Sequence, residues 1–164
     1  MTMTDTDIES RVVATLERLG IEHEVIRIDP NFADTAEFCE KYGYTLEGSG
    51  NTIIVASKRG AKKFCACIVQ GSARLDVNKT VKRLMGVSRA SFASADETKE
   101  LTGMMIGGVT AFALPDDLPV YADEKLLSQE SIILGSGSRS SKIQIAPQDI
   151  AKIPGAQFID GLSM

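Results

Sequence analysis

The chain has one histidine, no tryptophan and only three cysteines among its 164 residues. A histidine-based metal site needs a second imidazole, so we assign His23 no role and expect no metal and no other cofactor. Cys65 and Cys67 would point to the same face of one strand, and Cys39 makes the number of cysteines odd. The cysteines therefore indicate neither a disulfide framework nor a zinc site.

The sequence also lacks a basic excess and a long apolar run. Its formal net charge is -4 and its pI is about 5.1, which argues against a protein that coats nucleic acid along its length. No apolar run approaches the ~20 residues that span a bilayer, and the first residues lack the basic and apolar regions of a signal peptide. We expect a cytoplasmic protein that stays out of membranes and is a monomer or small homo-oligomer.

What is present favours one domain over residues 1–164. Hydrophobic residues make up 43% of the chain, enough for one sizeable core, and no repeat or linker divides it. Helical patterns fall between short strand patterns without strict alternation. This order predicts an α/β fold, with a mixed, barrel-like sheet surrounded by helices.

The centre of the predicted sheet is a hairpin. Residues 51–56 and 64–69 are continuous apolar runs of strand length, separated by the basic turn 58–63. Helices are expected over residues 32–42, after Asp76, and after Ser94, where Ser94 and Glu97 form a capping-box pattern.

Two glycine-rich turns are candidates for ligand binding. Gly107 and Gly108 leave a backbone that a ligand can approach, before a short strand expected over residues 109–112; a plain bend inside a sheet is the alternative. The turn 135–141 offers free amides and the Arg139 guanidinium, which suit phosphate or carboxylate. An ordinary flexible hairpin loop is the alternative there.

Four ordered segments of the chain resemble one known family. They are Asn-Thr-Ile-Ile-Val at 51–55, Ala-Arg-Leu-Asp-Val-Asn-Lys at 73–79, Thr-Gly-Met-Met-Ile-Gly-Gly-Val-Thr at 102–110, and Gly-Ser-Arg-Ser-Ser-Lys-Ile-Gln-Ile at 137–145, followed by Ala-Pro-Gln-Asp-Ile. In these segments the chain is similar to YbaK-type aminoacyl-tRNA editing domains, the YbaK/prolyl-tRNA synthetase-associated domain family. The resemblance covers nearly the whole chain and ends at Ile153.

The resemblance implies a function in translation fidelity. Family members occur alone as trans-editing deacylases or inserted in bacterial prolyl-tRNA synthetase, and they hydrolyse the ester of a small amino acid wrongly attached to a tRNA. The implied partners are the tRNA acceptor end and, further, an aminoacyl-tRNA synthetase. No metal is implied, because an activated ester needs only positioned water and amide donors for the oxyanion.

The resemblance also implies a pocket between the strand that opens at Asn51 and the two glycine-rich turns. Its catalytic positions would be Asn51, Gly107 and Gly108. The implied substrate-binding residues are Thr52, Val109, Thr110, Ala111, Gly137, Ser138 and Arg139. Lys58 and Lys79 are the expected tRNA contacts.

One departure leaves the function open. Many family members have a lysine where this chain has Asn51, so a cation that could hold the ester or the terminal phosphate is missing. We favour a free-standing deacylase with changed contacts. The alternatives are a non-catalytic binding module that keeps the pocket, and a hydrolase of another small acyl ester.

Overall fold

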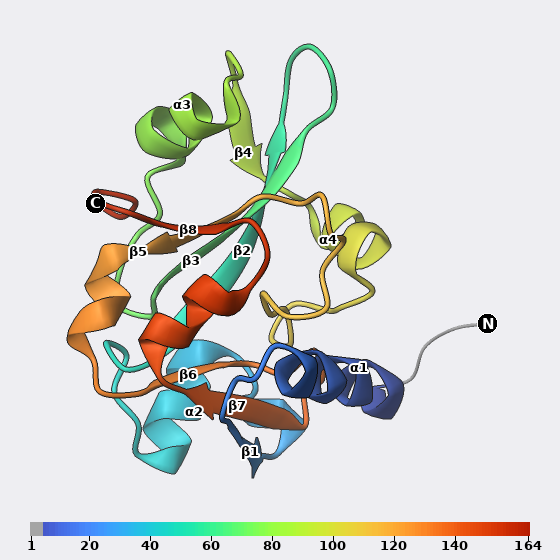
Figure 1. The fold of residues 1–164 in the computed structure, drawn as a ribbon, viewed down its shortest axis with the longest axis vertical. Coiled ribbons are helices and arrows are strands. Elements are labelled where there is room, and N and C mark those ends of the chain that lie inside the picture. The colour runs from blue at the N-terminus through green and yellow to red at the C-terminus, as the bar shows by residue number, and fades with distance from the viewer. Residues whose placement is uncertain (1–4) are drawn as a thin grey trace.

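The structure, a computed structural model, describes residues 5–164 and arranges them around two sheets (Figure 1). The five-stranded sheet has the order β4-β2-β3-β5-β8 and the three-stranded sheet the order β1-β7-β6. The strands are β1 (Glu24–Arg27), β2 (Gly50–Ser57), β3 (Phe64–Gln70), β4 (Ala90–Phe92), β5 (Val120–Asp123), β6 (Ile132–Gly135), β7 (Ser141–Ile145) and β8 (Ala156–Ile159).

The mixed sheet is confirmed. β3 pairs antiparallel with β2 and parallel with β5, and β5 is parallel to β8. The two sheets meet at a parallel bridge between Ser49 and Ile133. Within residues 5–164 the two sheets are joined but do not close into a barrel. The predicted sheet is therefore barrel-like only in that the two sheets meet along one side.

The predicted hairpin is also confirmed. β2 and β3 pair continuously from Gly50 opposite Gln70 to Ala56 opposite Phe64. Because side chains alternate along a strand, the two faces of β3 join different clusters. Ile68 packs in the larger core cluster, and Cys67 packs in a second cluster on the other face. Burial on both faces explains the continuous apolar run.

Four α-helices lie within the described chain: α1 (Asp5–Arg18), α2 (Thr35–Tyr42), α3 (Lys82–Met85) and α4 (Ala95–Thr102). Shorter helical segments are the 3-10 turns Pro30–Phe32, Glu124–Ser128 and Pro147–Lys152 and the π turn Val77–Val81. α4 has the predicted capping box: Ser94 Oγ accepts from Glu97 N, and the Glu97 carboxylate accepts from Ser94 N, both at 3.0 Å. α2 is shorter than predicted, because it begins only after Asp34.

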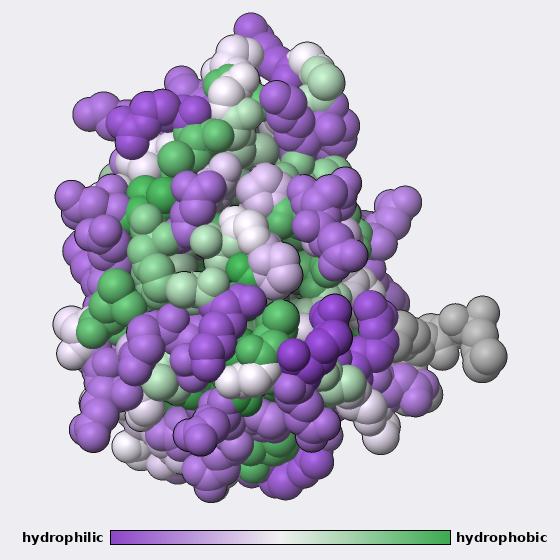
Figure 2. All heavy atoms as spheres, in the orientation of Figure 1, coloured by the Kyte–Doolittle hydropathy of each residue, from purple (hydrophilic) through white to green (hydrophobic). Residues whose placement is uncertain are grey.

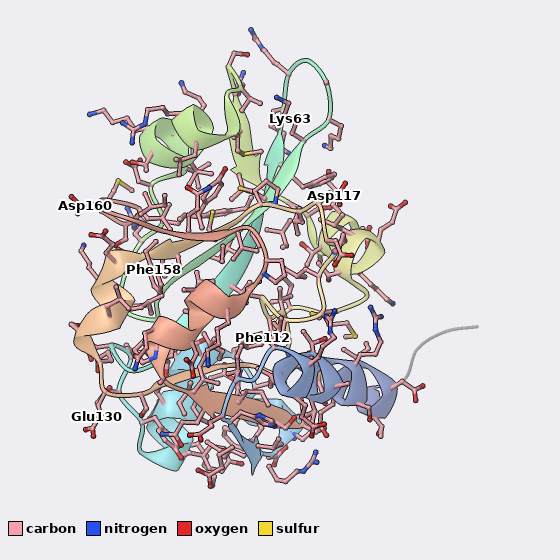
Figure 3. All side chains as sticks on the ribbon, viewed as in Figure 1. Lys63, Phe112, Asp117, Glu130, Phe158 and Asp160 are labelled. Atoms are coloured by element: carbon pink, nitrogen blue, oxygen red, sulfur yellow. The ribbon has the colours of Figure 1, made fainter. Side chains whose placement is uncertain are left out.

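The strand predicted over residues 109–112 is wrong. No strand is present there, and Phe112 is fully buried in the larger core cluster, in the loop near α1 (Figure 3). The physical reason is close backbone packing between the two glycine-rich turns. Gly137 N donates to Gly108 O at 2.7 Å, and a Cβ at Gly135 would lie only 2.5 Å from Val109 O. The segment is held by these contacts in place of a strand ladder.

The surface is mainly polar. Hydrophilic side chains cover much of the face in Figure 2, and apolar residues show between them near its centre. No helix within residues 5–164 is long and apolar enough to cross a membrane. Large apolar side chains that are at least half exposed include Phe92, Met105 and Ile106.

Candidate active site

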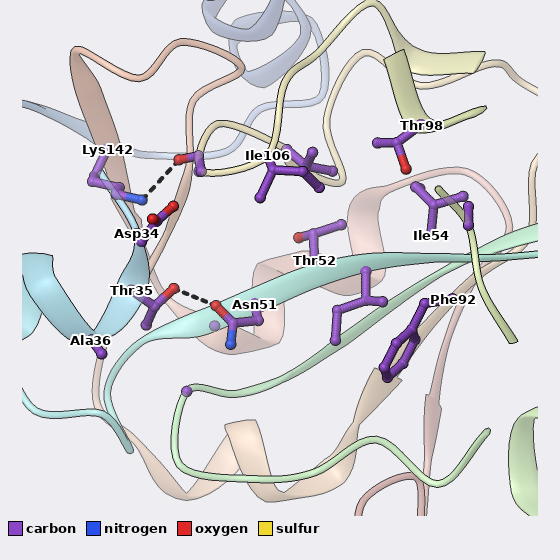
Figure 4. Close-up of a pocket in the computed structure, with 17 residues that line it drawn as sticks. Asp34, Thr35, Ala36, Asn51, Thr52, Ile54, Phe92, Thr98, Ile106 and Lys142 are labelled. Atoms are coloured by element: carbon purple, nitrogen blue, oxygen red, sulfur yellow. Dashed lines mark hydrogen bonds between the residues drawn. The ribbon is translucent and has the colours of Figure 1, made fainter. Parts of the chain in front are cut away.

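A cavity of about 500 Å³ lies beside the first half of β2 (Figure 4). Its walls come from β2, the start of α2, the loop before Gly108, the start of α4 and the strands β4, β6 and β7. The lining residues are Asp34, Thr35, Ala36, Gly50, Asn51, Thr52, Ile53, Ile54, Gly71, Phe92, Ala93, Thr98, Ile106, Gly107, Val109, Gly135 and Lys142.

The cavity follows an open edge of β2. β4 pairs with β2 at residues 55–57, and β6 lies on the same side of the chain at the start of β2, where Ile133 N donates to Gly48 O. Between them, residues 51–53 have no strand on that side in the part of the chain that the structure describes. Ile54 O accepts from Ala93 N on this outer side, whereas Ser57 N donates to Lys63 O on the β3 side. Backbone groups alternate between the two sides of an antiparallel strand. The N–H and C=O of Thr52 therefore point outward to the open edge.

Thr52 also brings a side-chain hydroxyl. Its Oγ1 is buried and has no hydrogen-bond partner among the described residues. Buried polar groups are normally paired, and an orphan at a cavity wall is a place where a ligand or water can supply the partner. One residue thus offers an amide, a carbonyl and a hydroxyl to the cavity.

Asn51 projects from the opposite face of β2 and is fixed by α2. Thr35 Oγ1 donates to Asn51 Oδ1, and the amide nitrogen of Asn51 points away from Thr35 (Figure 4). Thr35 is the first residue of α2. The Asn51 side chain is therefore an oriented amide.

Lys142 on β7 is a functional candidate that the sequence reasoning missed. Its residue exposure is 6%, and its Nζ donates to Ala33 O at 2.5 Å and to Gly107 O at 3.2 Å. The ammonium also lies 5.6 Å from the centroid of the Phe38 ring. Burial lowers the pKa of Lys142 to about 8, and the nearby Asp34 carboxylate opposes this shift. The side chain is still charged at neutral pH.

Asp34 is the other charged side chain among the described lining residues. It occupies the N-cap position of α2 but makes no side-chain bond to the helix amides. Its Oδ1 lies 3.4 Å from Arg139 Nη1. No group of three His, Cys, Asp or Glu side chains that could hold a metal ion occurs among residues 5–164.

Residues 29–153 match the aminoacyl-tRNA editing domain family. The chain belongs to this family. The uncharacterized protein YwhH of Bacillus subtilis (strain 168) is 32% identical over 128 residues, 73% of this chain and 80% of YwhH. The prolyl-tRNA editing protein ProX of Acetoanaerobium sticklandii is 23% identical over 154 residues, 91% of this chain and 92% of ProX.

Solved structures share the fold of this editing domain. The hypothetical protein APE2540 is 27% identical, with a TM-score of 0.83 over 94% of this chain and 99% of that one. A candidate trans-editing enzyme for prolyl tRNA synthetase is 27% identical, with a TM-score of 0.80 over 93% of this chain and 95% of that one. The family resemblance and the editing-domain fold are confirmed.

The editing domain brings four of the predicted site residues to the cavity: Asn51, Thr52, Gly107 and Val109. Gly108 lies behind the wall. Its amide donates to Met105 O at 2.9 Å, and a Cβ there would lie 2.9 Å from Gly137 O. The loop amide of Gly108 already has an acceptor, and its lack of a side chain lets the two glycine-rich turns touch.

The other predicted substrate-binding residues are not in the cavity lining. Thr110 and Ala111 are buried at 0% and 1% exposure. Gly137 packs on α1, because a Cβ there would lie 2.4 Å from Ile8, and Ser138 is buried beside it.

Arg139 has a structural role behind the cavity wall. Its Nη1 donates to Ile106 O at 2.5 Å, and its Nη2 donates to Pro30 O at 3.1 Å. These bonds tie the loop that carries Gly107 to the segment before α2. Arg139 therefore holds two walls of the cavity in place without lining it.

The expected tRNA contacts lie outside the cavity. Lys58, next to the tip of the hairpin, has its Nζ 3.7 Å from Glu97 Oε1. Lys79 is exposed on the π turn Val77–Val81. Lys62 Nζ lies 2.8 Å from Glu97 Oε2. The hydrogen bond from Lys62, the capping bond from Ser94 N and the charge of Lys58 together lower the pKa of Glu97 to about 2.

Proposed function

We propose that this editing domain is a free-standing deacylase that hydrolyses the ester between a small amino acid and the 3′ end of a mischarged tRNA. One relative supports this proposal. ProX is named as a prolyl-tRNA editing protein, and it aligns with this chain over nearly all of both chains. The support from geometry is the open edge of β2 inside the cavity. This edge carries the proposal because it presents unpaired donors where an ester can lie.

The reaction needs little from the protein beyond positioning. Water adds to the ester carbonyl carbon, the carbonyl oxygen takes negative charge, and the bond to the ribose oxygen then breaks. The ribose oxygen takes up a proton, and the amino acid leaves as a carboxylate. The outward amide of Thr52 is the donor we assign to the oxyanion. Removing one such donor typically costs about 2.7–4 kcal/mol of transition-state stabilisation.

The cavity would select a small amino acid by excluding larger side chains. Ile54 and Thr98 line the cavity and are each 3% exposed, so they form a fixed wall. One methylene gives only about 1–3 kcal/mol of discrimination by attraction, and therefore a wall that rejects larger side chains is the more effective device.

The acceptor end would lie at the mouth of the cavity. Phe92 lines the cavity and is 57% exposed, so its ring offers a face on which a terminal base can stack. Lys58 and Lys79 stay the proposed cations for the neighbouring phosphates. A synthetase partner, a cytoplasmic location and the oligomeric state also stay predictions.

The test is a deacylation panel. Purified protein is mixed with tRNAs that carry alanine, serine, cysteine, threonine or a large amino acid, and release of each is followed over time. We expect release of at least one small amino acid above the rate without protein, and none of the large one. Release of no amino acid from any tRNA by folded protein would contradict the proposal.

The second candidate is a non-catalytic binding module. It is favoured by Asn51, a neutral amide held by Thr35 where many family members have a lysine. A module of this kind would bind a non-hydrolysable acyl-adenosine analogue and release nothing. Binding without turnover would therefore separate the two functions.

A further inference from the structure

Lys142, which lines the cavity, has a spare hydrogen-bond donor. A lysine ammonium has three N–H groups. Two of them are directed at the carbonyl oxygens of Ala33 and Gly107, which hold Nζ in place between α2 and the glycine loop. The third has no protein acceptor assigned among the described residues and remains for a ligand. Lys142 is also the one cation among the described lining residues.

Asp34 offers the opposite charge on a neighbouring part of the wall (Figure 4). An aspartate at an N-cap usually accepts from the first helix amides, but here the carboxylate makes no such bond. It is 53% exposed, and its contact with Arg139 is long, at 3.4 Å. A carboxylate has about four acceptor positions, so Asp34 keeps capacity for a ligand donor.

The burial of Lys142 selects the part of the substrate that can reach it. Lys142 is 6% exposed, whereas a phosphodiester is hydrated and part of a long chain. A compact acyl group at the end of the tRNA is the piece that fits. It carries a carbonyl oxygen, which a cation attracts. It also carries an α-ammonium group, which a cation repels and a carboxylate attracts.

We infer that Lys142 and Asp34 recognise the two polar ends of an α-aminoacyl group. Lys142 Nζ donates to the ester carbonyl oxygen, and the Asp34 carboxylate accepts from the α-ammonium. This inference rests on the proposed function, because it takes the aminoacyl ester as the ligand. The unpartnered hydroxyl of Thr52 in the same cavity is an independent sign that a polar ligand belongs there.

The test uses two adenosine analogues with a stable amide in place of the ester. One carries an alanyl group on the 3′ nitrogen, and the other carries a propionyl group, which lacks the α-amino group. Binding of both to the full chain is measured by calorimetry at pH 7. The variants are Lys142→Met and Asp34→Asn. Lys152→Met and Asp160→Asn, on exposed positions away from the cavity lining, are the matched controls.

Charge-assisted hydrogen bonds set the expected size of each effect. We expect Asp34→Asn to weaken the alanyl analogue about tenfold to a hundredfold and to leave the propionyl analogue unchanged. We expect Lys142→Met to weaken both analogues by at least about tenfold. The wild type should prefer the alanyl analogue. The control variants should match the wild type.

The outcomes separate the inference from the proposed function. Equal binding of both analogues by the wild type, or an equal effect of Asp34→Asn on both, overturns the inference even if the deacylation panel finds turnover. The expected binding pattern without turnover upholds the inference and removes the deacylase. Thermal unfolding of each variant shows whether it is folded. If Lys142→Met does not fold, the inference is still tested by Asp34→Asn, whose side chain is half exposed, and by the preference of the wild type for the alanyl analogue.

Discussion

Thr35 Oγ1 donates a hydrogen bond to Asn51 Oδ1, and this bond joins the first residue of α2 to the strand beneath the cavity. Asn51→Lys would replace this acceptor with a cation. Under the deacylase proposal we expect the variant to maintain or raise turnover on a small mischarged substrate. Loss of the bond to Thr35 should lower the free energy of unfolding by about 1 kcal/mol.

Asn51→Ala is the control for that substitution, because it removes the same acceptor without adding charge. Turnover and urea unfolding are measured for both variants. Turnover created by Asn51→Lys in a protein that has none would identify the wild type as a binding module. A loss of turnover by Asn51→Lys alone would contradict the expectation.

The unpartnered hydroxyl of Thr52 gives a second expectation. Thr52→Val keeps the shape of the side chain and removes a buried group that lacks a partner, so we expect the free energy of unfolding to stay constant or rise by about 1–3 kcal/mol. Turnover should fall about tenfold if the hydroxyl contacts the substrate.

Thr110→Val is the informative comparison. Its hydroxyl is also buried and has no hydrogen-bond partner within residues 5–164, but Thr110 does not line the cavity. Thermal unfolding and deacylation are compared for the two variants. A larger loss of turnover at Thr110 than at Thr52 would reject Thr52 as the ligand contact.

Gly107 combines an unusual backbone with a crowded position. Its φ is +93°, and a Cβ there would lie 2.0 Å from Arg139 Nη1 and 2.9 Å from Asp34 Oδ1. We expect Gly107→Ala to destabilise the fold by about 1–3 kcal/mol and to lower turnover at least about tenfold, because the crowding moves two cavity walls apart.

Gly60→Ala is the matched control for backbone strain. Gly60 has a φ of +72° in the hairpin turn, with no atom within 4 Å of an added Cβ. It should lose stability through the backbone alone and retain turnover. Equal turnover of the two variants would show that crowding at Gly107 does not matter for activity.

The pKa of Lys142 leads to an expectation about stability at high pH. It is about 8 in the folded protein, against an ordinary value of 10.5, because burial disfavours the ammonium. Between these values the unfolded chain binds more protons than the folded chain, so folding stability rises with pH. The wild type should therefore gain stability relative to Lys142→Met from pH 8 to pH 10, by on the order of 2–3 kcal/mol.

Urea unfolding of both proteins at several pH values measures this difference, and a constant difference would contradict the lowered pKa. Ligand binding should change in the opposite direction. Deprotonation removes the charge that we assign to the ester carbonyl, so the propionyl analogue, which has no amino group of its own to titrate near pH 8, should bind more weakly above pH 8. The charged and titratable groups around Lys142 are Asp34, Arg139 and Cys39.

The sequence predicts the parts of the fold that depend on local patterns. The hairpin of β2 and β3 follows from two apolar runs around a basic turn, and α4 follows from the capping box at Ser94. The strand predicted over residues 109–112 fails because tertiary contact of two glycine-rich turns decides that segment.

Part of the candidate site is visible in the sequence. Asn51, Thr52 and Gly107 line the cavity as predicted from the family segments. Lys142 and Asp34 are not predictable in this way. A lysine that alternates with isoleucines along a strand looks like a solvated residue, and an aspartate before a helix looks like a cap. Only the packing of β7 against α2 shows where each charge lies.

Between β4 and the bridge of Ser49 to β6, a short stretch of β2 around Thr52 has an uncovered edge among the described residues, and this edge lies inside a cavity. Unpaired strand edges are usually a liability, because another chain can pair with them and start aggregation. Here Ile106, Gly107 and the start of α2 stand around the edge. The protein can thus keep an unpaired edge available to a short acyl group while limiting access for a whole strand of another molecule.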